Sequence, residues 1–152
     1  MYGNRYHLYR QTEVATADPK RLVILCYEGA IRSLKTAQQN YLSQDFEAKG
    51  TAIQNALDII SELREALDFE RGGEIAKYLD AIYSFMTRCI LKADRTRDTQ
   101  GFEHVGAMLE ELKSAWEEIF HSQRDGKDAS VSPVDVGYPP LKGTGAIQYQ
   151  GV

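Results

Sequence analysis

The feature that most constrains this fold is an uninterrupted run of six apolar residues, Leu22–Tyr27, near the start of the chain. Asp18 and Pro19 precede the run as a typical helix start, because Asp accepts the unpaired N–H groups of the first turn and Pro needs no N–H partner there. A surface helix uses one apolar stripe, recurring every three or four residues. The run exceeds such a stripe by three residues: Val23, Ile24 and Tyr27. We therefore expect this helix to have apolar neighbours on more than one side.

Apolar residues at helical spacing predict three further helices downstream, and strand-like alternation is not seen. Ser43 is the expected N-cap of the second helix, Gly72–Gly73 the turn before the third, and Asp98 or Thr99 the N-cap of the fourth. Short turns make consecutive helices antiparallel, so the predicted fold is an all-α, up-down four-helix bundle. The four expected helices cover residues 19–39, 46–67, 74–93 and 102–119.

The third helix also has more apolar surface than one face can use. Beside its main stripe runs a second one with spacings of four, three and four residues. Residues at these spacings lie on one side of a helix. The second stripe consists of Tyr78, Ile82, Phe85 and Cys89.

Both ends of the chain differ from the bundle in composition. Residues 1–17 contain Tyr6 and Tyr9 and are too aromatic for a solvated tail, so we expect a strap that packs on the outside of the bundle. The bundle is expected at residues 18–121. Residues 122–152 hold three of the four prolines and lack periodicity, which is typical of a flexible tail.

Composition excludes several functional classes. The net charge of −4 and the absence of a basic patch argue against a nucleic-acid partner. No apolar run approaches the roughly 18 residues of a membrane span, and no signal-peptide core is present, so we expect a cytosolic protein without membrane insertion. Both cysteines lie in apolar helical patterns and are expected to be reduced thiols.

No catalytic residue, metal site or cofactor is expected. Glu118 and His121 have the spacing found in di-iron helical bundles, but such a site needs a second Glu-x-x-His and two more inward carboxylates. Ser, Cys and His are too dispersed to form a nucleophile with its base.

The surplus apolar surface has two interpretations, both open at this level. In the first, the strap covers one surplus face and a dimer contact covers the other, which composition alone slightly favours. In the second, a groove on the bundle accepts an apolar segment of another protein.

Three blocks of the sequence, in order, resemble the flagellar secretion chaperones of the flagellin-binding FliS family. The resemblance extends from about Tyr6 to Phe120. Asp18 replaces a frequent serine and Cys26 a frequent leucine, and the tail has no counterpart in the family. The blocks are Tyr9-x-x-x-x-Val14-x-Thr16-Ala17-x-Pro19-x-x-Leu22-x-x-x-Cys26-Tyr27-x-Gly29-Ala30, then Asp58-Ile59-Ile60-Ser61-Glu62-Leu63 with Leu67-Asp68 and Gly72-Gly73-Glu74-Ile75-Ala76-x-x-Leu79-x-x-x-Tyr83-x-x-Met86, and finally Leu109-x-x-Leu112-x-x-x-Trp116.

The resemblance implies a cytosolic chaperone that binds the C-terminal segment of flagellin, prevents its premature polymerisation and keeps it competent for flagellar type III export. Export-gate components are further candidate partners. Client binding is expected to displace the strap. The expected partner-binding residues are Tyr6, Tyr9, Val23, Ile24, Tyr27, Tyr78, Ile82 and Phe85. The alternative function is a non-catalytic helical interaction or dimerisation module.

Overall fold

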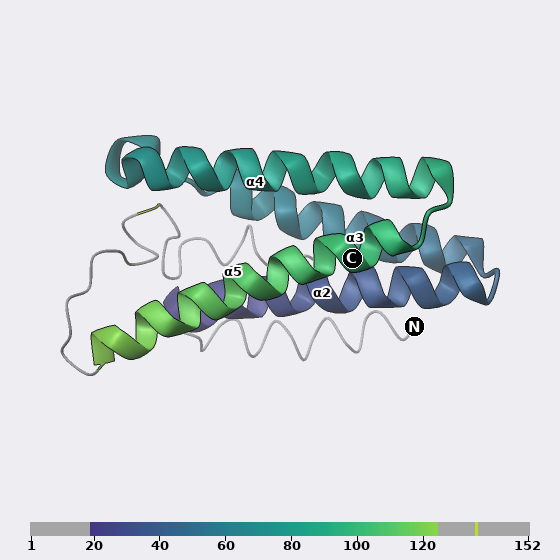
Figure 1. The fold of residues 1–152 in the computed structure, drawn as a ribbon, viewed down its shortest axis with the longest axis horizontal. Coiled ribbons are helices and arrows are strands. Elements are labelled where there is room, and N and C mark those ends of the chain that lie inside the picture. The colour runs from purple at the N-terminus through teal and green to yellow at the C-terminus, as the bar shows by residue number, and fades with distance from the viewer. Residues whose placement is uncertain (1–18, 125–135, 137–152) are drawn as a thin grey trace.

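The fold is an antiparallel four-helix bundle, as the sequence predicts (Figure 1). It was obtained as a computed structural model, which describes residues 19–124 and residue 136. Within these residues no strand occurs. The helices are α2 (Pro19–Leu42), α3 (Phe46–Glu65), α4 (Phe69–Thr96) and α5 (Gln100–Arg124).

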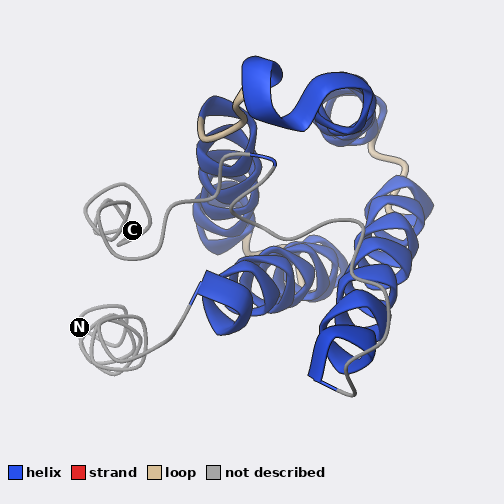
Figure 2. Cartoon of the chain, turned by 90° about the vertical axis from the view of Figure 1, so that its left-hand side faces the viewer, coloured by secondary structure: helices blue, strands red, loops and turns tan. Residues whose placement is uncertain are grey.

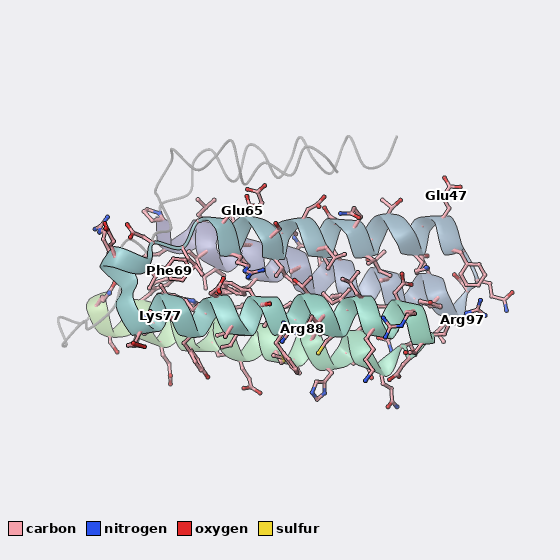
Figure 3. The ribbon with its side chains drawn as sticks, turned by 90° about the horizontal axis from the view of Figure 1, so that it is seen from above. Glu47, Glu65, Phe69, Lys77, Arg88 and Arg97 are labelled. Carbon is pink, nitrogen blue, oxygen red and sulfur yellow. The ribbon has the colours of Figure 1, made fainter. Side chains whose placement is uncertain are left out.

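The four helices form a four-sided arrangement when the bundle is seen end-on (Figure 2). The main contacts join α2 to α3, α2 to α5, α3 to α4, and α4 to α5, so α2 and α4 occupy diagonal corners. In a view along the length of the helices, Phe69 and Lys77 lie toward one end of the bundle, and Glu47 and Arg97 lie at the other (Figure 3). We refer to these as the Phe69 end and the Arg97 end.

Helix α2 is the most thoroughly enclosed element. Every residue of the Leu22–Tyr27 run is at most 5% exposed. Two neighbouring helices, α3 and α5, pack against α2, and Tyr27 reaches α4 across the interior. The prediction that this helix has apolar neighbours on several sides is therefore confirmed.

The turn between α2 and α3 corrects one predicted cap. Asp45, not Ser43, is the N-cap of α3, and its carboxylate accepts a hydrogen bond from the Ala48 N–H at 3.1 Å. The Ser43 hydroxyl instead donates to the Asn40 carbonyl at 3.3 Å. Between them Gln44 adopts a left-handed conformation with φ of 65°. This extra residue carries the chain around the turn, so the cap falls two residues later than expected.

Helix α4 begins at Phe69, five residues before the predicted start at Glu74. The Asp68 carboxylate caps it by accepting from the N–H groups of Glu70 and Arg71 at 3.0 and 3.1 Å. The turn expected at the glycine pair is instead a kink at Gly73, with φ of 52° and ψ of −128°. Residues with a side chain rarely adopt this conformation. The kink separates the first turn of α4 from the rest of the helix.

The junction of α4 and α5 is compact. Arg97 ends α4 in a left-handed conformation, and the Asp98 N–H bonds to the Ala93 carbonyl at 3.0 Å, which satisfies one of the last carbonyls of the helix. The Asp98 side chain accepts from the Gln100 N–H at 3.2 Å, as expected of an N-cap. At Gly101 a Cβ atom would lie only 2.6 Å from the Cβ of Ala93, so the two backbones approach more closely than a side chain permits.

Helix α5 continues to Arg124, past the boundary expected at residue 121. The strap of residues 1–17 lies outside the described residues, as does most of the predicted tail. Val136 is described, and it is buried at 1% exposure in the core. Its carbonyl accepts a hydrogen bond from the Asp68 N–H at 2.8 Å.

Candidate functional site

The candidate site is an apolar stripe on the outer side of α4. We define the α4 stripe as Ile75, Tyr78, Ile82, Phe85 and Cys89, whose spacings of three, four, three and four place them on one side of the helix. Tyr78 is 67% exposed, and Phe85 is 45% exposed. Ile82 and Cys89 are partly buried and pack against the core. Ile82 and Cys89 therefore anchor the stripe to the bundle, while the rings of Tyr78 and Phe85 are exposed to solvent.

Exposed apolar surface is concentrated on α4. In the part of the chain that the structure describes, five of the seven large apolar side chains with high exposure belong to this helix. The other two, Leu42 and Phe46, flank the turn between α2 and α3. Ile75, Tyr78 and Phe85 share one side of the helix, whereas Leu91 lies on the other flank. A shared side of this kind, unlike single exposed residues, is typical of an interaction surface. The five on α4 are Phe69, Ile75, Tyr78, Phe85 and Leu91.

A cation borders the stripe, and an ion pair holds the opposite flank of α4. The Arg88 guanidinium lies 5.9 Å from the centre of the Phe85 ring, within the range of a cation–π contact. Asp80 forms an ion pair with Arg64 of α3 at 2.6 Å, which links the middle of α4 to its neighbour. This pairing holds α4 in place from the side while its outer face stays open.

The inner side of α4 is tied to the core by a polar contact. The Tyr83 hydroxyl lies 2.6 Å from the Tyr27 hydroxyl, and the Trp116 indole N–H donates to that same Tyr27 oxygen at 3.0 Å. All three side chains are at most 4% exposed. Burial, followed by the neighbouring Tyr83, raises the pKa of Tyr27 well above its ordinary value of 10.0. Three helices, α2, α4 and α5, meet at this hydroxyl.

A second polar cluster secures the Arg97 end. The Tyr41 hydroxyl donates to the backbone carbonyl of Asp94 at 2.9 Å, and the Lys49 ammonium lies 2.9 Å from the Asp94 carboxylate. Loss of hydration and the adjacent Asp94 raise the pKa of the Tyr41 hydroxyl. This cluster joins α2, α3 and the C-terminal part of α4.

The predicted site residues fall into three groups. Tyr78, Ile82 and Phe85 come together on the α4 stripe. Tyr6 and Tyr9 lie outside the described residues. The remaining three face the interior: Val23, Ile24 and Tyr27, at 2%, 4% and 0% exposure. The six described residues thus do not form one continuous surface.

Sequence reasoning missed part of the exposed surface. Ile75 is 40% exposed, although its spacing from Leu79 also fits the main apolar stripe of this helix. The signal was present, because Ile75 precedes Tyr78 by three residues and so extends the second stripe by one position. Phe69 was missed because the helix was expected to begin after it.

The site has the chemistry of a binding surface for an apolar partner. In residues 19–124 and 136, acidic, His and Cys side chains do not gather in groups of three that could hold a metal ion. Over the same residues, no helix is both long and apolar enough to cross a membrane. The α4 stripe is a row of apolar side chains on which the apolar face of another helix can pack.

Comparison with known proteins identifies the relatives of this chain. The sequence matches the family described as flagellar protein FliS over residues 2–123. It is 39% identical to the flagellar secretion chaperone FliSB of Pseudomonas aeruginosa over 111 residues, which cover 73% of this chain and 88% of that protein.

Proteins of two other bacteria are also similar to this chain. Identity to the flagellar secretion chaperone FliS of Vibrio cholerae is 36% over 108 residues, 71% of this chain and 79% of the relative. For the flagellar secretion chaperone FliS of Bacillus subtilis it is 29% over 127 residues, 84% of this chain and 94% of the relative.

Proposed function

This chain belongs to the FliS family of flagellar proteins, and on that premise we propose that it is a flagellar export chaperone. Its client is the C-terminal segment of flagellin, which it binds in the cytosol. Binding prevents premature polymerisation and keeps the client competent for flagellar type III secretion. Export-gate components are proposed as further partners.

The observation that carries this proposal is the exposed α4 stripe. An amphipathic helix of the client, laid along the stripe, would cover Tyr78 and Phe85 with its own apolar face. Burial of apolar surface contributes about 25 cal/mol per Å2 before the cost of ordering the client is subtracted. A client that folds on binding loses part of this gain, which keeps the complex releasable.

The buried members of the predicted site suggest an order of events. Val23, Ile24 and Tyr27 are enclosed in the structure, whereas the α4 stripe is open. We propose that the client contacts α4 first and that contact with the α2 residues follows displacement of the strap that carries Tyr6 and Tyr9. Tyr27 would be the last to be reached, because its hydroxyl bonds to two other helices.

The proposal is tested by calorimetric titration with a flagellin C-terminal peptide of about 40 residues, enough for two helices of bundle length. We expect saturable one-to-one binding with a negative heat-capacity change. Tyr78→Asp should weaken binding at least tenfold. Leu42→Asp is the matched control, because Leu42 is 72% exposed but lies beside the Arg97 end, and it should leave affinity unchanged.

Two results would count against the proposal. If a soluble peptide does not bind the folded wild-type protein, the chaperone function is wrong. If the free protein is an obligate dimer that Tyr78→Asp converts to monomers, the stripe serves self-association, and the alternative of a helical dimerisation module is correct.

A further inference from the structure

One residue from beyond α5 is part of the core. Val136 is 12 positions past the last residue of that helix (136 − 124), yet only 1% of its surface is exposed. Its carbonyl is bonded to the Asp68 N–H at 2.8 Å. Both the side chain and the backbone of this residue are therefore held at the junction of α3 and α4.

The junction provides what is needed to hold a peptide. Asp68 lies between two helices and acts as the N-cap of α4, and the N–H of a cap has no carbonyl partner in the helix that follows. Such a donor needs an acceptor from elsewhere when it is withdrawn from water. The Val136 carbonyl supplies that acceptor, and the valine side chain joins the apolar core beside it. The junction thus binds one aliphatic side chain and one backbone carbonyl, which are the groups that a peptide segment presents.

The position of this contact relates it to the α4 stripe. Asp68 immediately precedes Phe69, which is 48% exposed, and Ile75, at the N-terminal end of the stripe, is 40% exposed. Helix α5 also ends at the Phe69 end of the bundle, because consecutive helices are antiparallel (Figure 1). Val136, 12 positions beyond α5, is therefore bonded close to the point where the stripe begins.

We propose that the junction is a peptide-docking position that the chain fills with its own Val136, and that Val136 competes there with the client. This inference rests on the proposed function. A client segment that follows the stripe past Ile75 reaches Phe69 and then the Asp68 N–H. Only one carbonyl and one side chain can occupy that position, so self-docking lowers the apparent affinity for the client. The family match ends at residue 123, so Val136 lies outside the region matched to the family.

The competition has a predictable size. Burial of one valine side chain shifts an equilibrium constant by about tenfold or somewhat more. Removal of the self-docked residue should therefore raise client affinity by about tenfold. This gain is limited by the fraction of molecules in which Val136 is docked.

The experiment uses the full chain and two independent measurements. Val136→Asp places a charge where the core is apolar, and Val136→Ala removes two methyl groups with little risk to folding. Hydrogen exchange of the Asp68 amide reports docking without any client. Titration with the flagellin C-terminal peptide reports competition. Leu42→Asp makes the same change from apolar to acidic at the opposite end of the bundle and serves as the control.

In Val136→Asp we expect the Asp68 amide to exchange about tenfold faster and the affinity for the client peptide to rise about tenfold. For Val136→Ala we expect an exchange rate and an affinity between those of wild type and Val136→Asp. Leu42→Asp should change neither. Unchanged exchange of Asp68 would overturn the docking. Faster exchange with unchanged client affinity would overturn the competition while the proposed function stands. If neither wild type nor Val136→Asp binds the peptide, the proposed function and the competition fail together, and Asp68 exchange still decides the docking.

Discussion

The hydroxyl oxygens of Tyr27 and Tyr83 lie 2.6 Å apart in the interior of the bundle, with neither side chain exposed to solvent. The contact joins α2 to α4 across the diagonal of the bundle. Because α4 carries the exposed stripe on its other side, this hydrogen bond fixes the rotation of the helix that presents Tyr78 and Phe85.

Replacement of Tyr27 by Phe should lower the free energy of unfolding by about 1–3 kcal/mol. The variant loses the hydrogen bonds with Tyr83 and Trp116 while it keeps the ring that fills the core. Urea denaturation followed by circular dichroism measures the change. Tyr78→Phe is the matched control, since Tyr78 is 67% exposed, and it should change stability by less than about 0.5 kcal/mol. Equal effects of the two substitutions would contradict this prediction.

The buried hydroxyl also predicts sensitivity to alkali. The pKa of Tyr27 is raised in the folded protein, so above pH 10 the unfolded chain loses a proton that the folded chain retains. The contribution of Tyr27 to the free energy of unfolding is therefore fully present below about pH 10 and decreases as the pH rises further. Unfolding curves measured between pH 8 and about 11.5 should show this loss, and it should be smaller in Tyr27→Phe. A pH dependence identical in the two proteins would show that Tyr27 is not responsible.

Gly101→Ala should destabilise the protein by about 1–3 kcal/mol, because the new methyl group would meet the Cβ of Ala93 at 2.6 Å. Gly106→Ala, one turn and a half further along α5, offers the contrast. A Cβ there has nothing within 4 Å, and alanine is the better helix former, so stability should rise by up to about 1 kcal/mol. Thermal melts of both variants measure the difference in sign. A stabilised Gly101→Ala would contradict the close approach of α4 and α5.

Glu62→Gln should stabilise the protein at neutral pH and have little effect under acidic conditions. Burial, and then the nearby Glu65 and Asp58, raise the pKa of Glu62 above its ordinary value of 4.5. The folded state therefore binds this proton more tightly, and the contribution of Glu62 is lost as the pH rises through the raised pKa. Urea midpoints of wild type and variant at pH 7 should differ, and those near pH 3.5 should converge. A constant difference across this range would argue for another cause.

Helical periodicity was enough to predict the number, type and order of the elements, because each helix carries a complete apolar stripe. It also located Tyr78, Ile82 and Phe85 on one side of the third helix. Cap positions were less predictable: Ser43 and Asp45 are both good N-caps, and the choice depends on the left-handed Gln44 between them. Local residue preferences do not contain that information.

The fate of surplus apolar residues depends on what packs against them, which a one-dimensional pattern cannot show. Val23 and Ile24 on α2 and Tyr78 on α4 were equally in excess of one stripe, yet the first two are enclosed and the third is open. Val136 is a second residue whose burial the sequence pattern does not predict. Its segment has no periodicity and was expected to be a flexible tail, so the burial of Val136 is evident only in three dimensions.

The distribution of the two cysteines has a practical consequence. Cys26 is 1% exposed within the core, whereas Cys89 is only partly buried and is the last residue of the α4 stripe. A maleimide dye added to the native protein should therefore label Cys89 far faster than Cys26. Cys89 is thus a natural attachment point for a dye on the surface proposed to receive the client. Fluorescence of the attached dye can follow complex formation without any engineered cysteine.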